Sequence, residues 1–283
     1  AGASDGSGER ARFSYPKSLA IDRAGNVYVA DAANQTIRKI SPGGEVTTLA
    51  GKAGESGSAD GRGEQARFNY PYGVAVAADG NVYVADTFNS TIRKISPAGL
   101  VTTLAGRPGV LSSNDGVGRG AGFTYPYGIT VDESGNIYIA DTGNSSIRKI
   151  TRGGVVSTYA GASGNLGRQD GTRQEARFSY PHDLAIDAAG YLLVADTSNQ
   201  SLRVIAPNGT VTTLAPSFPD PEAVTVDSRG SIYVVDGHAN AGIHGVRGGP
   251  LPFAPQSPPE HRKSPSPHQA SRPYPPTAAP PTI

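Results

Sequence analysis

The sequence predicts an all-β protein, a β-propeller of four-stranded antiparallel blades with four complete blades and a partial fifth. One observation is a repeat with a constant spacing of 55 residues, seen in the Tyr-Pro pairs that begin at Tyr15, Tyr70, Tyr125 and Tyr180. The other is that each copy contains four short strands separated by turns, with no helical period. Sheets that are apolar on both faces must pack against one another, and a ring of such sheets is a propeller.

The first copy shows the expected elements in order. A first strand ends in a Gly-Asn turn at Gly25-Asn26, which is typical of a hairpin. The second strand is an unbroken apolar run and should be buried on both faces. A third strand follows, and the turn Pro42-Gly43-Gly44 leads into the fourth. The four expected strands cover 18–22, 26–30, 36–40 and 46–50.

The repeat register divides the chain into three parts. Residues 1–15 are interpreted as the end of a preceding blade, with Ala1-Gly2 aligned with Ala50-Gly51, followed by a linker. The propeller is expected over 16–247, and because the repeat breaks off after Asp236, closure of the ring stays open. A Pro-rich segment, 248–283, is expected to be a disordered tail. The expected blades lie near 16–51, 71–106, 126–161, 181–215 and, as a partial copy, 221–247.

Composition excludes several classes of function. The chain has 25 Lys and Arg against 24 Asp and Glu, a net charge of +1, which disfavours nucleic-acid binding driven by bulk positive charge. It has no cysteine, so disulfides, thiolate zinc sites and thiol nucleophiles are excluded. No apolar run approaches the length that a membrane-spanning helix needs, so no membrane span is predicted.

The stretch from Pro71 to Ile95 resembles an NHL repeat, because Pro, Gly-Asn, Ala-Asp, Asn and Ile-Arg all occur at that family's spacing. Copies at Pro16, Pro126 and Pro181 match equally well, and the one at Pro221 is weaker. The resemblance is to bacterial NHL proteins with long Asp-Gly linkers. It implies a usually six-bladed propeller that serves as a binding platform or sensor, in an extracytoplasmic or secreted location. A few related propellers are lyases or lactonases.

Three polar residues recur in every complete copy, and we interpret them as structural. Each second strand ends in Asp, an Asn follows three residues later, and an Arg lies on the third strand. We expect the Asp and Asn to bond the connecting turn, and a partly buried Asp–Arg pair to lock blades together. The Asp-Gly pairs of the linkers, such as Asp5-Gly6, are interpreted as turns. The recurring set is Asp31, Asn34, Arg38, Asp86, Asn89, Arg93, Asp141, Asn144, Arg148, Asp196, Asn199 and Arg203.

The sequence offers little support for catalysis or metal binding. The recurring strand-end Asp residues are spread around the ring and cannot all contact one ion. Each linker contains a single Asp, whereas a calcium loop supplies several oxygen ligands at short spacing. There is no Gly-x-Ser-x-Gly elbow. We therefore predict no catalytic residue, no metal and no cofactor. The alternative is a lyase- or lactonase-like enzyme that uses a metal at the mouth of the propeller channel.

Topology predicts where a ligand would bind. The long linkers, for example from Lys52 to Tyr70, and the turn after the second strand belong on one face, whereas the opposite face has only tight turns. The residue after each Pro opens the innermost strand on the long-loop face. We expect a monomer that binds a protein, peptide or glycan there. Alternatively, Tyr72 and Tyr127 could only plug the channel. The predicted site residues are Lys17, Tyr72, Tyr127 and His182, with Phe88 on a neighbouring turn.

Overall fold

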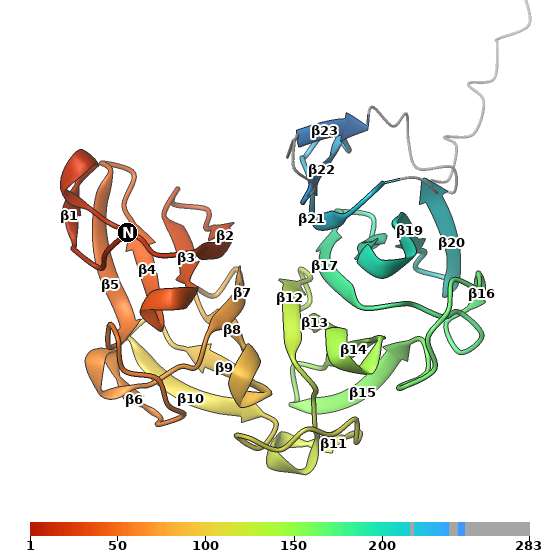
Figure 1. The fold of residues 1–283 in the computed structure, drawn as a ribbon, viewed down its shortest axis with the longest axis horizontal. Coiled ribbons are helices and arrows are strands. Elements are labelled where there is room, and N and C mark those ends of the chain that lie inside the picture. The colour runs from red at the N-terminus through yellow and green to blue at the C-terminus, as the bar shows by residue number, and fades with distance from the viewer. Residues whose placement is uncertain (216–217, 238–242, 247–283) are drawn as a thin grey trace, which may run out of the picture.

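The computed structural model describes residues 1–215, 218–237 and 243–246, and the Pro-rich segment 248–283 lies outside these ranges. Five antiparallel sheets follow one another along the chain and are arranged around a common centre (Figure 1). This confirms the prediction of an all-β chain with four complete blades and a partial fifth. Among the described residues, no helix has the length and apolarity required to cross a membrane.

Within each blade, the strands run in chain order from the centre outward. The innermost strands are β2 (Pro16–Ile21), β7 (Pro71–Val76), β12 (Pro126–Val131), β17 (Pro181–Ile186) and β21 (Pro221–Val226). The next are β3 (Val27–Asp31), β8 (Val82–Asp86), β13 (Ile137–Asp141), β18 (Leu192–Asp196) and β22 (Ile232–Asp236). The third strands are β4 (Thr36–Ile40), β9 (Thr91–Ile95), β14 (Ser146–Ile150), β19 (Ser201–Ile205) and β23 (Ile243–Val246). The fourth are β5 (Glu45–Gly51), β10 (Leu100–Ala105), β15 (Val155–Ala160) and β20 (Thr210–Ala215).

The four complete blades have five strands rather than the expected four. A two-residue strand from each linker pairs with the fourth strand of the blade that follows that linker, as Gly6 pairs with Val46. So short a segment shows no alternation of apolar and polar residues, and the sequence pattern therefore did not reveal it. These edge strands are β1 (Gly6–Ser7), β6 (Gly61–Arg62), β11 (Gly116–Val117) and β16 (Gly171–Thr172).

Short 3₁₀ turns connect the second and third strands of the complete blades. Each of these turns ends in a residue with left-handed backbone geometry, such as Gln35 at φ 62°. They lie at the same end of the blade as the start of the innermost strand, since Pro71 pairs with Asp86. The turns are η2 (Ala32–Asn34), η4 (Thr87–Asn89), η6 (Thr142–Asn144) and η7 (Thr197–Asn199).

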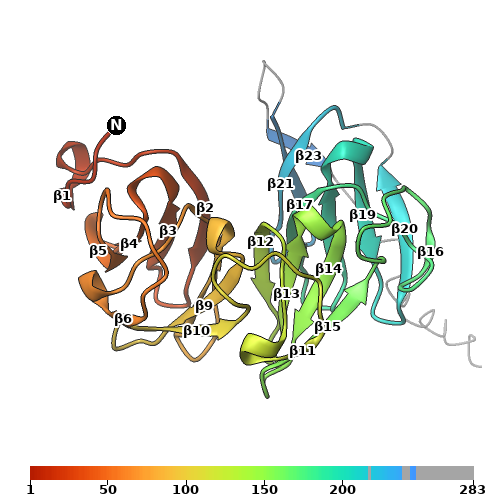
Figure 2. The same ribbon diagram turned by 60° about the horizontal axis from the view of Figure 1, so that its bottom comes forward.

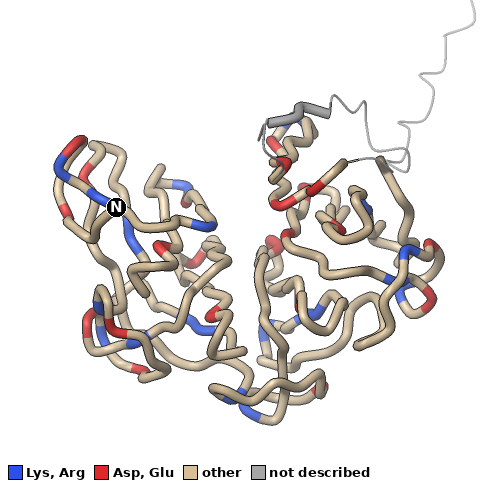
Figure 3. The backbone as a smooth tube through the Cα atoms, viewed as in Figure 1, with Lys and Arg blue, Asp and Glu red and all other residues tan. Residues whose placement is uncertain are grey.

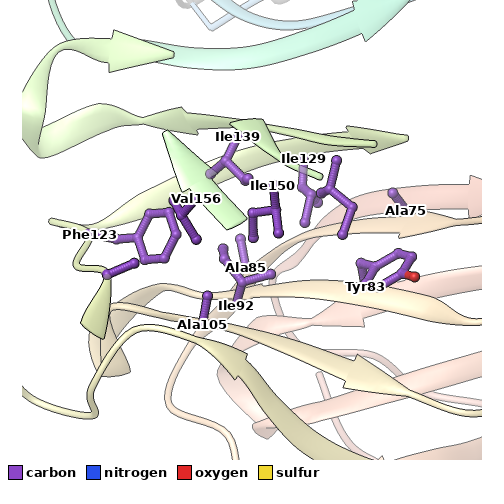
Figure 4. Close-up of a cluster of buried hydrophobic side chains, with 12 residues drawn as sticks. Ala75, Tyr83, Ala85, Ile92, Ala105, Phe123, Ile129, Ile139, Ile150 and Val156 are labelled. Carbon is purple, nitrogen blue, oxygen red and sulfur yellow. The ribbon is translucent and has the colours of Figure 1, made fainter. Parts of the chain in front are cut away.

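Apolar side chains fill each junction between neighbouring blades. Figure 4 shows the junction between the second and third blades, where Phe123 and Ile150 face Ala85 and Ile92. Similar clusters occupy the other three junctions. Burial between sheets is therefore the main force that stacks the blades.

In the part of the chain that the structure describes, the arc of blades is open between the first and fifth sheets (Figures 1 and 2). Leu19 on β2 is 70% exposed, whereas its counterpart Val74 on β7 is 3% exposed. At the other end, Tyr233 is 39% exposed, whereas its counterpart Tyr28 is 6% exposed. The two terminal sheets thus present to solvent the apolar faces that are buried at each inner junction.

The first residues of the chain lie in a linker and not at the end of a preceding blade. The N–H of Gly2 donates to the carbonyl of Phe13, just as the N–H of Gly57 donates to the carbonyl of Phe68. Gly2 is therefore the counterpart of Gly57, and its alignment with Gly51 is wrong. The local resemblance of two Ala-Gly pairs misled the sequence alignment.

Two polar contacts join neighbouring blades directly. The Thr142 hydroxyl donates to the carbonyl of Pro181 on the next blade at 2.7 Å, and Thr87 and Thr197 make the same bond. The Tyr before each Pro adopts a left-handed backbone, and the N–H of Tyr180 donates to the Ser145 hydroxyl at 3.2 Å. The threonine bonds fix the starts of β12, β17 and β21 against the preceding blade.

We expect Thr142→Ala to lower the free energy of unfolding by about 1 kcal/mol, because the buried carbonyl of Pro181 loses its donor. Thr142→Ser keeps the hydroxyl and should retain most of that stability. Urea denaturation of both variants measures the difference. Equal losses in the two variants would show that the methyl group, and not the hydrogen bond, matters at this position.

Candidate functional site

Four of the predicted site residues lie side by side where the innermost strands begin, and we call them the channel row: Lys17, Tyr72, Tyr127 and His182. The rings of Tyr72 and Tyr127 are stacked, with centroids 4.3 Å apart and planes inclined by 5°. His182 packs edge-on to Tyr127 at 4.9 Å, and the ammonium of Lys17 lies 5.2 Å from the Tyr72 centroid. Successive innermost strands thus supply a continuous row of contacts.

Phe88 belongs to a second group, the aromatic rim, which consists of Tyr70, Phe88 and Tyr125. Its ring stacks on Tyr70 at 5.1 Å and meets Tyr125 edge-on at 6.1 Å. Phe88 is 49% exposed and Tyr125 is 40% exposed. The sequence analysis missed the two tyrosines, although the repeated Tyr-Pro pairs were the available signal. The structure places Phe88 with these residues and not in the channel row.

Acidic residues lie at the His182 end of the channel row. Burial raises the pKa of Asp183 to about 7, and Oδ2 of Asp183 accepts the N–H of Val224 on the next blade at 3.1 Å. Burial also lowers the pKa of His182, whereas nearby Glu222 opposes that shift. Asp183 was missed because its position holds Ser18, Gly73 and Gly128 in the other complete blades, so no recurring pattern marks it.

Close packing explains a glycine beside this carboxylate. A Cβ built on Gly128 would lie 2.5 Å from Oδ1 of Asp183 and 2.8 Å from the His182 carbonyl oxygen. Any larger residue would push the third and fourth innermost strands apart. Gly128 therefore lets the channel row close up between Tyr127 and His182.

The recurring arginines are fully buried and meet two carboxylates each. Nη1 of Arg93 lies 2.7 Å from Asp86, and Nη2 lies 2.8 Å from Asp60 of the linker. The same guanidinium donates to the carbonyls of Arg67 and Ala59, both at 2.9 Å. Arg38, Arg148 and Arg203 repeat this arrangement with their own partners.

The sequence pattern predicted that these ion pairs lock one blade to another. That prediction is wrong, because each pair lies within one blade and its linker. Asp86 and Arg93 lie on adjacent strands of one sheet, and Asp60 lies in the linker that leads into that sheet. The linker Asp is thus a partner of the buried arginine and not only a turn former. Linker and blade meet in space but are far apart in sequence, so the spacing of a lone Asp-Gly pair could not reveal the contact.

The strand-end Asp and its Asn partner also hold the linker rather than the connecting turn. Oδ1 of Asp86 accepts the N–H of Asn69 at 2.7 Å, just before the innermost strand. The Asn89 amide donates to Oδ2 of Asp86 at 2.8 Å and to the carbonyl of Gly57 at 2.7 Å. Asp31, Asn34, Asp141, Asn144, Asp196 and Asn199 make the equivalent bonds.

Within the described residues, no three acidic or histidine side chains are grouped so that they could hold a metal ion. The carboxylates of the buried network are already bonded to arginine, asparagine and backbone N–H groups. The channel row itself contributes aromatic, ammonium and imidazole groups. This arrangement suits contact with a ligand better than coordination of a cation.

We expect Arg93→Leu to lower the free energy of unfolding by about 3–5 kcal/mol, because two carboxylates and two carbonyls lose a buried donor. Arg62→Leu is the matched control, since Arg62 lies in the same linker region with an exposed side chain. Urea denaturation of both variants provides the comparison. Similar stabilities would contradict a structural role for the buried arginine.

The raised pKa of Asp183 predicts a pH dependence of stability. The folded state holds the Asp183 proton up to about pH 7, against a reference pKa of 3.8, so ionisation of this group opposes folding. The stability that it contributes is complete below pH 3.8 and is lost as the pH rises to about 7. Asp183→Asn should remove this part of the pH profile, because an amide does not ionise. Parallel profiles for parent and variant would contradict the shift.

Family comparisons agree with the repeat pattern. The model of the NHL repeat matches residues 13–40, 123–150 and 178–205, and the model of the teneurin NHL domain matches residues 52–121. Together they fall on all four complete blades.

Known proteins show similarity over the same region. Protein SUPPRESSOR OF QUENCHING 1 of Arabidopsis thaliana is 36% identical over 132 residues, which cover 44% of this chain and 12% of that protein. NHL repeat-containing protein 2 of Bos taurus is 29% identical over 235 residues, which cover 78% of this chain and 30% of that protein. The chain therefore spans less than a third of the length of either relative.

Solved structures support the fold alone, because their sequence identities are low. Virginiamycin B lyase from Staphylococcus aureus aligns with a TM-score of 0.55 at 16% identity, over 84% of this chain and 71% of that one. An auxiliary nutrient binding protein from Bacteroides thetaiotaomicron aligns with a TM-score of 0.54 at 15% identity, over 86% and 71%. From its repeats and its matches, this chain belongs to the NHL-repeat family.

Proposed function

We propose that this chain is a non-enzymatic binding module that recognises a protein, peptide or glycan through its long-loop face. The main support for this proposal is that the channel row and the aromatic rim occupy the same face. Their five rings, those of Tyr70, Tyr72, Phe88, Tyr125 and Tyr127, all lie at the start of an innermost strand or on the adjoining turn. Rigid aromatic side chains with polar tips are enriched in recognition surfaces.

The packing of the rings favours some ligands over others. Tyr72 and Tyr127 cover one face of each other, so a ligand meets mainly ring edges and hydroxyl groups. The outer face of Tyr72 holds the Lys17 ammonium, which a basic group of a ligand could replace with the same cation–π contact. Stacking of a sugar ring requires free aromatic faces, and we therefore favour a peptide or protein segment over a glycan.

Charge argues against a nucleic-acid partner. The net charge of the chain is +1, and acidic and basic residues are interspersed around the sheets (Figure 3). A nucleic-acid partner would call for a broad basic surface. A fold neighbour described as a nutrient binding protein is consistent with ligand binding on such a scaffold.

A lyase-type activity is the second candidate. It is favoured by the fold neighbour virginiamycin B lyase and by His182, whose lowered pKa leaves the imidazole neutral and able to accept a proton near pH 7. Elemental analysis after dialysis distinguishes the two candidates. A stoichiometric divalent ion would favour the lyase, and metal-free protein that still binds its ligand would favour the binding module.

We expect the double variant Tyr72→Ala/Tyr127→Ala to lose about 5- to 1,000-fold in ligand affinity, because removal of aromatic contact residues costs about 1–4 kcal/mol of binding energy. Ligands are selected on the parent protein from a displayed random-peptide library and a glycan array. Affinities of the selected ligands are then measured for the parent and the variant.

Leu100→Ala is the matched control, because Leu100 is 44% exposed and follows a tight turn at the opposite face. Thermal melting of each variant reports whether the fold is intact. A double variant that melts early yet binds the selected ligands normally would place the two tyrosines in a channel plug and overturn the proposed site.

A further inference from the structure

A hollow lies on the tight-turn face, away from the channel row. Its volume is about 610 Å³, and it lies where the third and fourth blades meet. The first turn of each of these blades contributes to its wall, and so does the linker that joins them. The lining residues used below are Val131, Glu133, Lys149, Tyr159, Arg173 and Ile186.

Two residues of this hollow depart from the repeat, and the repeat thereby provides an internal control. Tyr159 takes a position that is leucine in the other complete blades, at Leu49, Leu104 and Leu214. Arg173 takes a position that is glycine in the other linkers, at Gly8, Gly63 and Gly118. Since the other blades fold with leucine and glycine, the blade architecture does not require a tyrosine and an arginine here.

The two substituted residues contact each other. The Arg173 guanidinium lies 4.2 Å from the centroid of the Tyr159 ring, and Nη2 donates to the carbonyl of Pro207 at 3.0 Å. Nε of Arg173 is buried and makes no hydrogen bond within the described residues. Lys149 joins the group, with its ammonium 5.8 Å from the Tyr159 centroid and 5.3 Å from that of Tyr138. Two cations therefore lie within 6 Å of one aromatic ring.

The charge of these cations is not balanced by ion pairs. Every arginine of the buried network meets two carboxylates, but in the described part of the chain neither Arg173 nor Lys149 forms an ion pair. Two acids in the wall bond their own turns, since Asp132 accepts from Asn136 and Asp187 accepts from Tyr191. Their counterparts Asp22 and Asp227 bond in the same way, so these acids belong to the repeat.

We propose that this hollow binds a small organic anion, with its carboxylate or phosphate group between Lys149 and Arg173. Because the Arg173 guanidinium covers a face of the Tyr159 ring, the edge of that ring and the apolar side chains of Val131 and Ile186 would contact the body of the ligand. Charge-assisted hydrogen bonds to an oxyanion would satisfy both cations and the unbonded Nε. The exposed acid Glu133 at the edge of the hollow would disfavour dianions that lack an apolar body. This site is separate from the long-loop face and independent of the function proposed there.

The test uses three probes of similar shape: benzoate, phenyl phosphate and benzamidine. Isothermal titration of the whole chain should show binding of benzoate or phenyl phosphate, and the stronger of the two identifies the preferred oxyanion. Benzamidine, which carries a cation on the same ring, should not bind. Binding of benzamidine as tight as that of the anions, or no binding of either anion, would overturn the proposal.

Two variants that restore the repeat residues test the assignment to this hollow. Arg173→Gly should weaken anion binding by about tenfold, the effect of losing one charge-assisted contact. Tyr159→Leu should weaken it by a similar factor, because it removes the ring against which both cations pack. Arg119→Gly removes the same charge from an exposed linker position and should leave the affinity within about twofold. Melting temperatures establish that each variant is folded. Unchanged affinity in a folded Arg173→Gly or Tyr159→Leu variant would show that the anion binds elsewhere.

Discussion

The buried arginine with its two carboxylates is the interaction on which each complete blade depends. A guanidinium that is fully desolvated is costly unless its charge and its donors are satisfied, and here one carboxylate comes from the same sheet and the other from the linker. The linker is therefore part of the blade that it leads into. It adds the edge strand, supplies two carbonyl acceptors and places a Phe ring against the guanidinium, as Phe68 does for Arg93 at 5.2 Å.

This arrangement separates two kinds of stabilisation. Polar interactions act mostly within a blade, where geometry is fixed by a single sheet and its linker. Apolar clusters act between blades and are supplemented by the Thr-to-Pro and Tyr-to-Ser bonds at the start of the innermost strand. Because the channel row is built from these strand starts, the contacts that stack the blades also set the spacing of Tyr72, Tyr127 and His182.

The features that recur in every copy of the repeat could be predicted from the sequence. Strand order, the partial fifth blade and the proximity of Lys17, Tyr72, Tyr127 and His182 follow from periodicity and from the up-and-down topology. Contacts between linker and blade could not be predicted, because Asp60 and Arg93 are brought together only by the folded sheet. Residues that occur once were missed for the opposite reason. The repeat is broken at Asp183, Tyr159 and Arg173. Because each of these residues occurs in one copy only, an analysis of recurring residues does not detect them.

The exposed terminal sheets have a consequence for motion. A blade inside the arc has apolar neighbours on both sides, whereas among the described residues the first and fifth blades have such a neighbour on one side only, as the exposure of Leu19 and Tyr233 shows. In stacked repeats, stability is approximately a sum over neighbouring contacts, so local opening begins at the ends. Amide protons of β2 should then exchange with solvent sooner than those of β12. Lys17 would then move relative to the stacked rings of Tyr72 and Tyr127, which lie on inner blades with neighbours on both sides.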